Sequence, residues 1–158
     1  MYTTRITLRP YLQEYMLAKF SDDRKQPCKI PPSSDLYLLI LDLLARRPAS
    51  AVRDTGNLEI ILPNRAMGKR TSTFNFLSEK SQYEIDRHIY VMFWAEFHRY
   101  CEYQIHVKGE SLLVAVLLFK SMYDIESLSQ DAFIKNYQRW RDRQCQQRRV
   151  YRSRQRLI

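Results

Sequence analysis

The sequence predicts a mainly helical α+β protein, in which a helical core is combined with a small β element of two or three strands and a pair of C-terminal helices. Three observations support this prediction. Apolar residues recur at helical spacing after residue 81, and a short apolar run between Gly56 and Pro63 is typical of a strand. The apolar segment 111–123 is followed by a good helix cap. With 45% hydrophobic and 13% aromatic residues, the 158-residue chain has enough apolar surface to fold.

Two helices are predicted in the first 48 residues. Pro10 suits the first position of a helix that continues at helical spacing to about residue 20. The second helix, 36–44, is almost wholly apolar and is therefore expected at the centre of the core. Ser33 or Ser34 can cap its N-terminus, and Pro48 is expected to stop it after two arginines that favour its C-terminal end.

Three segments have strand character. Residues 1–8 alternate weakly, 57–62 is a clear apolar run, and 73–77 is a candidate partner for that run. If 57–62 and 73–77 pair, the basic loop 64–73 is a hairpin tip comparable to a wing. Its cations are then a second candidate contact for phosphates: Arg65, Lys69 and Arg70. A solvated turn explains the same loop equally well.

Two further helices are expected in the helical part of the chain, 78–143. The pattern Ser81-x-x-Glu84 is typical of a capping box, and it begins a long amphipathic helix that ends before Gly109. The next segment, 111–123, is apolar nearly all round, so a buried helix is expected. Together with a mixed part, 1–77, these helices would form a single globular domain spanning 1–143.

The last predicted helix begins after a short link, 124–129. Ser129 is a good N-cap, and Leu128 and Phe133 match a hydrophobic staple. On a helical wheel of 132–146, one side collects residues that can pack: Phe133, Tyr137, Trp140 and Gln144. The opposite side collects cations and an amide: Lys135, Asn136, Arg139 and Arg143. One face can therefore pack while the other presents groups that donate to bases and phosphates.

The positive charge is concentrated at the C-terminus. The chain carries 26 Lys and Arg against 17 Asp and Glu, a net charge of +9, and residues 132–158 hold nine of these cations but only one acid. A basic extension, 144–158, contains five arginines: Arg148, Arg149, Arg152, Arg154 and Arg156. These closely spaced cations repel one another, and a polyanionic partner that neutralises them is the simplest explanation. Nucleic acid is the most common partner of this kind. The alternatives are a solvated tail, another anion, or docking on the body of the protein or on another subunit through Val150, Tyr151, Leu157 and Ile158.

Part of this region resembles a helix-turn-helix. The resemblance lies in Leu117-Leu118-Phe119-x-x-x-Tyr123-x-Ile125, followed by Leu128-Ser129-x-Asp131, and it covers 111–143. The same segment resembles the C-terminal DNA-binding segment of replication initiators. The whole sequence is also similar to small DNA-binding proteins encoded by prophages and mobile elements, which implies DNA binding and regulation of transcription. An ordinary helical hairpin with a solvated cationic face is the alternative.

No motif of catalysis or cofactor binding is found in the sequence. It contains no nucleophile elbow and no phosphate-binding glycine-rich loop. His98, Cys101, Glu102 and His106 lie at helical spacing, but one helix cannot readily close a zinc shell. We therefore expect no enzyme activity, metal or cofactor. The apolar runs are too short to cross a bilayer, and three widely spaced cysteines favour a reducing, cytoplasmic location.

These observations together predict a non-enzymatic protein that binds nucleic acid, with duplex DNA as the expected partner. Lys135, Asn136, Arg139 and Arg143 would face a groove, while the arginines of the extension contact phosphates. The main alternative is a prophage structural or assembly protein, in which the long helix forms a homo-oligomer interface and the basic end binds an acidic protein. RNA remains open, because phosphate contacts alone do not distinguish it from DNA.

Overall fold

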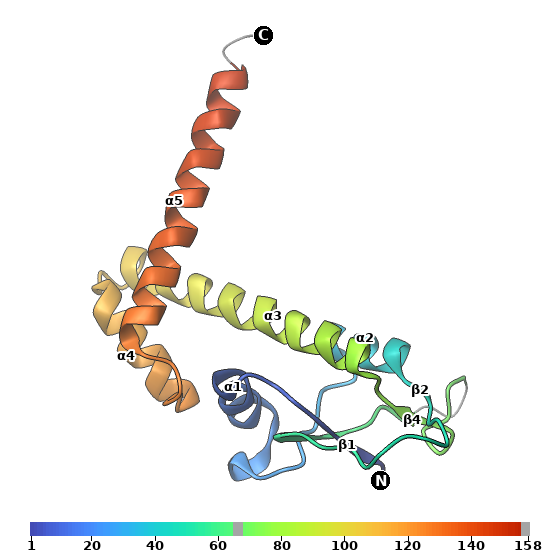
Figure 1. The fold of residues 1–158 in the computed structure, drawn as a ribbon. Coiled ribbons are helices and arrows are strands. Elements are labelled where there is room, and N and C mark those ends of the chain that lie inside the picture. The colour runs from blue at the N-terminus through green and yellow to red at the C-terminus, as the bar shows by residue number, and fades with distance from the viewer. Residues whose placement is uncertain (65–67, 156–158) are drawn as a thin grey trace. The chain divides into compact units, whose positions relative to one another are not determined.

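Helices dominate the fold, and the strands are confined to two small sheets. The structure is a computed structural model that describes residues 1–64 and 68–155. Over these residues it contains five α-helices and two two-stranded antiparallel sheets, which confirms the α+β, mainly helical class (Figure 1). The elements in chain order are β1 (Thr3–Ile6), α1 (Pro10–Phe20), the 3-10 helix η1 (Asp22–Arg24), α2 (Asp35–Leu43), β2 (Ala45–Arg46), β3 (Leu58–Ile61), β4 (Phe74–Phe76), α3 (Glu79–His106), α4 (Leu112–Tyr123) and α5 (Gln130–Gln155).

The chain divides into two compact units. Unit 1 consists of Met1–Trp94 together with Tyr123–Ile125, so it holds both sheets, α1, α2 and the first part of α3. Unit 2 consists of Ala95–Met122 and the chain from Glu126 on, so it holds the second part of α3, nearly all of α4, and α5. The predicted helix-turn-helix-like segment therefore lies almost wholly in unit 2.

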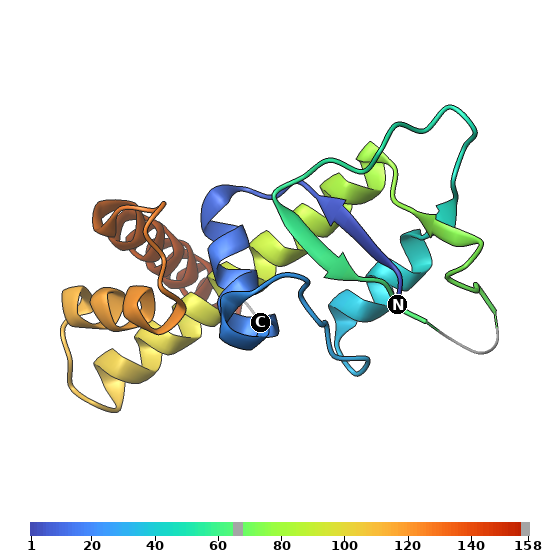
Figure 2. The same ribbon diagram turned by 90° about the horizontal axis from the view of Figure 1, so that it is seen from below.

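The core of unit 1 forms where α1, α2 and the first part of α3 meet the larger sheet. In that sheet β1 pairs with β3 in an antiparallel register that places Thr3 opposite Ile61 (Figure 2). Alternate residues of both strands are buried, as expected for a sheet with one covered face. The helices contribute fully buried side chains to the same core: Leu12, Met16, Leu36, Ile40, Ile85, Ile89 and Phe93.

The predicted strand pairing is wrong. β3 pairs with β1, and β4 pairs with β2, so the segment 64–73 does not form the tip of a β3–β4 hairpin. The prediction that Pro48 ends α2 is also wrong. The helix ends at Leu43, because Leu44 adopts an extended conformation, and the next two residues form β2. Arg46 therefore belongs to a strand, and it does not cap the helix.

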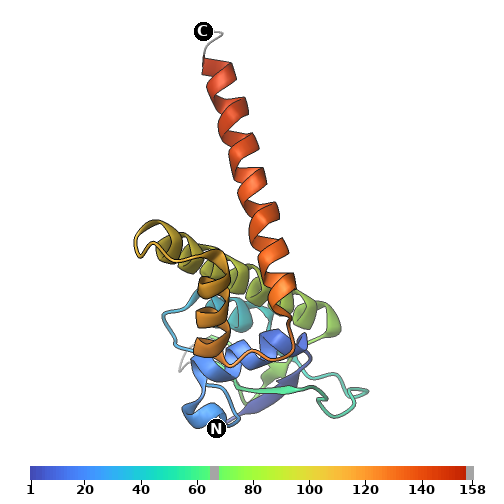
Figure 3. The same cartoon turned by 90° about the vertical axis from the view of Figure 1, so that its left-hand side faces the viewer.

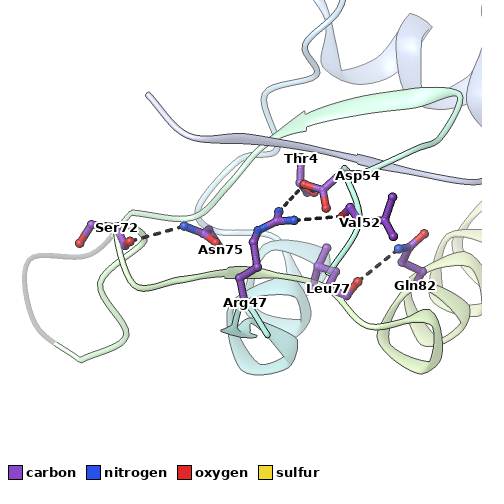
Figure 4. Close-up of polar contacts among 8 residues, drawn as sticks. All are labelled: Thr4, Arg47, Val52, Asp54, Ser72, Asn75, Leu77 and Gln82. Carbon is purple, nitrogen blue, oxygen red and sulfur yellow. Dashed lines mark hydrogen bonds and ion pairs between the residues drawn. The ribbon is translucent and has the colours of Figure 1, made fainter. Parts of the chain in front are cut away.

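A small polar network ties the segment after β2 to β1. Arg47 donates from one guanidinium nitrogen to the carboxylate of Asp54, at 2.7 Å, and from another to the carbonyl of Val52, at 3.4 Å (Figure 4). Thr4 donates its hydroxyl to the same Asp54 oxygen, at 2.8 Å. The network satisfies the half-buried carboxylate and links this segment to β1 through Thr4.

Serine caps begin several of the helices. Ser34 accepts a hydrogen bond from the backbone N–H of Tyr37, which confirms one of the two predicted caps of α2. Ser129 accepts from the N–H of Ala132 and confirms the predicted cap of α5. The capping box predicted at Ser81 is wrong by three residues, because α3 begins at Glu79 and Ser78 accepts the N–H of Ser81.

The helix α4 is less buried than its composition predicts. Ala115, Val116 and Phe119 are fully buried, but four apolar side chains on the other side are 42–48% exposed: Leu113, Leu117, Leu118 and Met122. The expectation of a helix buried all round is therefore wrong. One side of α4 packs, and the other presents an apolar face.

The helix α5 is longer than predicted. It continues through most of the basic extension and ends at Gln155, and every residue from 145 to 155 is exposed. Figure 3 shows these last turns of α5 extending beyond α4, its neighbour in unit 2. The extension is thus a continuation of a packed helix.

Candidate nucleic-acid interface

The first half of α5 is anchored by buried aromatic side chains. The ring of Phe133 lies 4.9 Å from that of Phe97 on α3 and 6.1 Å from that of Phe119 on α4, and all three are fully buried. One turn later, the hydroxyl of Tyr137 donates to Glu102 at 2.5 Å. Burial, together with this hydrogen bond, raises the pKa of Tyr137, which therefore stays neutral. These contacts confirm the predicted packed side of the helix.

Asn136 belongs to this anchor and not to the exposed cations. Its side-chain oxygen lies 2.7 Å from Nε2 of His98, which is itself buried and stacked on Trp140 at 4.5 Å between ring centroids. Since an amide oxygen only accepts, Nε2 of His98 carries the proton. The predicted placement of Asn136 in a groove-facing stripe is therefore corrected. Its side chain holds α5 to α3.

The buried imidazole makes the stability of the fold depend on pH. Burial lowers the pKa of His98 below its ordinary value, and the hydrogen bond to Asn136 opposes this shift only in part. The unfolded chain therefore takes up a proton near pH 6.5, while the folded chain resists protonation until a lower pH. We expect the free energy of unfolding to fall as the pH drops below about 6.5.

Denaturant unfolding of the wild type and of His98→Gln at several pH values between 7 and 5 tests this prediction. Other titrating groups are common to both proteins, so the difference between their curves isolates His98. We expect the variant to lose less stability than the wild type over this range. Parallel curves would show that another group is responsible.

The cations of the predicted stripe are exposed, as the wheel indicated. Lys135, Arg139 and Arg143 all point to solvent. Lys135 pairs with Asp131 one turn earlier, at 2.7 Å, but both side chains are more than half exposed, so this pair contributes little to stability. Arg143 donates from Nε to the carbonyl of Arg139 at 3.3 Å, which leaves the two terminal nitrogens of its guanidinium directed elsewhere.

The arginines of the extension are exposed and lack partners in the part of the chain that the structure describes. Arg148, Arg149, Arg152 and Arg154 form no hydrogen bond or ion pair with residues 1–64 or 68–155. At 100° per residue, the cations of α5 fall into two groups. The outward stripe covers about 140° of the helix, is centred about 130° from Phe133, and consists of Lys135, Arg139, Arg143, Arg149 and Arg154. The lateral arginines are centred about 80° from Phe133 on the opposite flank of the helix and are Arg141, Arg148 and Arg152.

The outward stripe borders a shallow hollow that the sequence prediction did not identify. Six exposed side chains of α5 line this open surface hollow: Arg143, Gln146, Gln147, Val150, Tyr151 and Arg154. Val150 is 51% and Tyr151 63% exposed, so neither docks on the folded part of its own unit. The recurrence of these residues every three or four positions was a signal for a shared face. It was obscured because most of them are polar.

In the 64–73 loop, the second predicted phosphate contact, Lys69 is engaged in hydrogen bonds within the protein, unlike the arginines of the extension. Lys69 donates to the carbonyls of Asp42, at 2.6 Å, and Leu44, at 3.0 Å, at the C-terminal end of α2. It therefore supplies the cation that this helix end favours. Arg70 is exposed in unit 1. The other two predicted site residues, Arg65 and Arg156, lie outside the described residues.

Of the three cysteines, Cys28 and Cys101 are buried and Cys145 is exposed. Across 1–64 and 68–155, no group of three or more His, Cys, Asp or Glu side chains could hold a metal ion. Burial raises the pKa of Cys28 to about 11 and that of Cys101 to about 12, so both thiols remain protonated near neutral pH. No helix in the described chain is both long enough and apolar enough to cross a membrane.

Comparison of the chain with models of protein families, with curated proteins and with solved structures finds no match.

Proposed function

We propose that this protein is a non-enzymatic DNA-binding protein whose helix α5 lies in a groove of duplex DNA. The observation that carries the proposal is the arginine-rich end of α5, where Arg148, Arg149, Arg152 and Arg154 are exposed without an acidic partner in the described chain. Cations held together on a rigid helix repel one another, and a partner rich in phosphates relieves that repulsion while releasing its own counterions.

The outward stripe suits a groove with phosphates on both walls. A helix with its side chains is about 10–12 Å across, and the major groove of B-form DNA is about 12 Å wide. Arg149 and Arg154 lie about 140° apart around the helix, so they can reach opposite walls while the residues between them face the floor. The major groove of A-form RNA is too narrow for this arrangement, which favours DNA as the partner.

The packed side of α5 supports the same orientation. Phe133 and Tyr137 hold the helix against α3 and α4, and the outward stripe is centred about 130° around the helix from Phe133. The stripe runs from Lys135 to Arg154, about 29 Å at 1.5 Å per residue. DNA can therefore follow the outward side of α5 without displacing its anchor. We further propose a cytoplasmic role in the regulation of transcription.

Removal of residues 144–158 tests the contribution of the extension. We expect the slope of log affinity against log salt concentration to become shallower by roughly 0.9 for each phosphate that the truncated chain no longer neutralises. The measurement is a fluorescence-anisotropy titration of a labelled duplex at several salt concentrations. The truncated chain should keep its unfolding transition, because residues 145–155 are all exposed. An unchanged slope would remove the extension from the interface.

A second candidate function is supported by the exposed face of α4. Leu113, Leu117, Leu118 and Met122 form an apolar surface of the kind that marks protein interfaces. This observation favours the alternative of a structural or assembly protein that forms oligomers. Light scattering at two salt concentrations distinguishes the two candidates, since an oligomer held by apolar contacts persists in high salt, whereas DNA binding weakens.

A further inference from the structure

The hollow on α5 combines groups that are seldom exposed together on a solvated helix. Its lining brings two arginines, two glutamines, a valine and a tyrosine together on the last turns of α5, where most of the other side chains are polar. Val150 and Tyr151 are both more than half exposed. A helix end that served only to track phosphates would need the cations alone. The amides and the exposed valine therefore call for a partner that offers hydrogen bonds and an apolar contact at the same place.

We propose that this hollow reads base edges in the major groove of duplex DNA, so that the protein is a sequence-specific binder. The inference rests on the proposed function and names the part of α5 that supplies the specificity. Arg143, Gln146 and Val150 lie within about 60° of one another on the outward side of the helix. They span about 10 Å along its axis, a length that matches about three base-pair steps of 3.4 Å.

Each of these three side chains fits a particular base. A guanidinium can donate two hydrogen bonds to O6 and N7 of guanine, a glutamine amide can pair with N6 and N7 of adenine, and an apolar group can contact the methyl group of thymine. The bond from Nε of Arg143 to the carbonyl of Arg139 orients its guanidinium and leaves the terminal nitrogens for a base. The hollow therefore favours a short site that contains a G·C pair next to A·T pairs.

Charge distinguishes duplex DNA from a second copy of α5 as the occupant. Arg143 and Arg154 border the hollow, and Arg149 lies on its far flank. Pairing with the same face of another α5 would place these cations against their own copies and add repulsion. A groove floor between two phosphate backbones supplies the opposite charge on both flanks.

Selection of bound duplexes from a randomised pool tests the proposal with the full chain. The wild type is expected to enrich a short site containing guanine and adjacent A·T pairs. Gln146→Ala, which preserves helix propensity and charge, should lose the preference at one adenine position. For the wild-type site it should lose roughly 5- to 150-fold in affinity, the range for one bidentate pair with a base. Its affinity for random duplexes and its salt slope should be unchanged.

Two variants serve as controls for this experiment. Gln138→Ala makes the same substitution at an exposed position of α5 outside the hollow, and it should enrich the wild-type site. Arg149→Gln removes a flanking cation, so it should weaken binding to all duplexes alike and reduce the magnitude of the salt slope by about 0.9.

The outcomes separate this inference from the proposed function. Enrichment that changes in Gln146→Ala but not in Gln138→Ala supports the readout. Binding of random duplexes by the wild type without enrichment overturns the readout and leaves the proposed function in place. The same site enriched by the wild type and by Gln146→Ala also overturns it. If the wild type binds no duplex at all, both proposals fail.

Discussion

Neutralising Arg143, Arg149 and Arg154 together, each by substitution with glutamine, is expected to lower the affinity of the full chain for duplex DNA by about a hundredfold. Each basic residue close to an anionic surface contributes about a fivefold factor in affinity, and the three side chains all belong to the outward stripe. Because they are exposed and glutamine is a good helix former, the variant should unfold at the wild-type temperature. Anisotropy titrations at low salt measure the drop in affinity.

The lateral arginines provide a matched control on the same helix. Arg141, Arg148 and Arg152 are also exposed, and their substitution with glutamine removes the same number of charges. We expect this second variant to lose less than tenfold in affinity, because its side chains point away from a groove that faces the outward stripe. Equal losses in the two variants would mean that net charge alone governs binding. No loss in either variant would exclude α5 from the interface.

Local signals explain why the helix starts and the orientation of α5 could be predicted from the sequence. Pro10, Ser34 and Ser129 each act through backbone groups a few residues away, so their effect is contained in the local pattern. The same holds for the packed side of α5, where Phe133 and Tyr137 contrast strongly with Lys135 and Arg139. The wheel needs only that contrast to separate the two sides.

Strand pairing could not be predicted in this way, because it depends on segments far apart in the chain. Apolar alternation identified β1, β3 and β4, but the nearest candidate partner of β3 in sequence was the wrong one. β3 instead pairs with β1, so that Ile6 lies opposite Leu58, and both residues are buried on the covered face. The pairing of a strand depends on the side chains that pack against it in the folded core. The local sequence pattern therefore does not reveal its partner.

The exposure of α4 and the role of Asn136 were missed for a related reason. A helix that is apolar all round carries no contrast to show which side packs, so the exposed face of Leu113, Leu117 and Met122 could not be separated from the buried face. Asn136 stands at the border between the two sides of α5. Its partner, His98, lies on another helix, and only the tertiary structure brings the two together.

The length of α5 is explained by the lack of helix-breaking residues in this part of the sequence. From 130 to 155 the chain contains neither glycine nor proline, and its arginines and glutamines are good helix formers. A helix already anchored by buried aromatic residues continues through such a segment at little cost. The high positive charge of 144–158 favours a separate tail, whereas its helix propensity favours the continuous helix that the structure shows to Gln155.

Substitution of Phe133 with alanine is expected to produce the largest loss of stability among changes to α5. The side chain is fully buried between Phe97 and Phe119, where the three helices of unit 2 meet, so its removal leaves a cavity and also reduces the buried apolar area. We expect about 3–5 kcal/mol, a large share of the roughly 5–15 kcal/mol that stabilises a typical domain. Denaturant unfolding monitored by circular dichroism measures the change in the free energy of unfolding.

Leu117→Ala on the exposed side of α4 is the control for Phe133→Ala, and it should cost less than about 1 kcal/mol because the leucine is 42% exposed. At a temperature where Phe133→Ala is still folded, its DNA affinity should equal that of the wild type, since no cation of the outward stripe has changed. The variant with glutamine at positions 143, 149 and 154 should show the reverse, with reduced DNA affinity and wild-type stability. If Phe133→Ala cost no more than Leu117→Ala, the aromatic cluster would not be the anchor of α5, and the orientation of the outward stripe would lose its support.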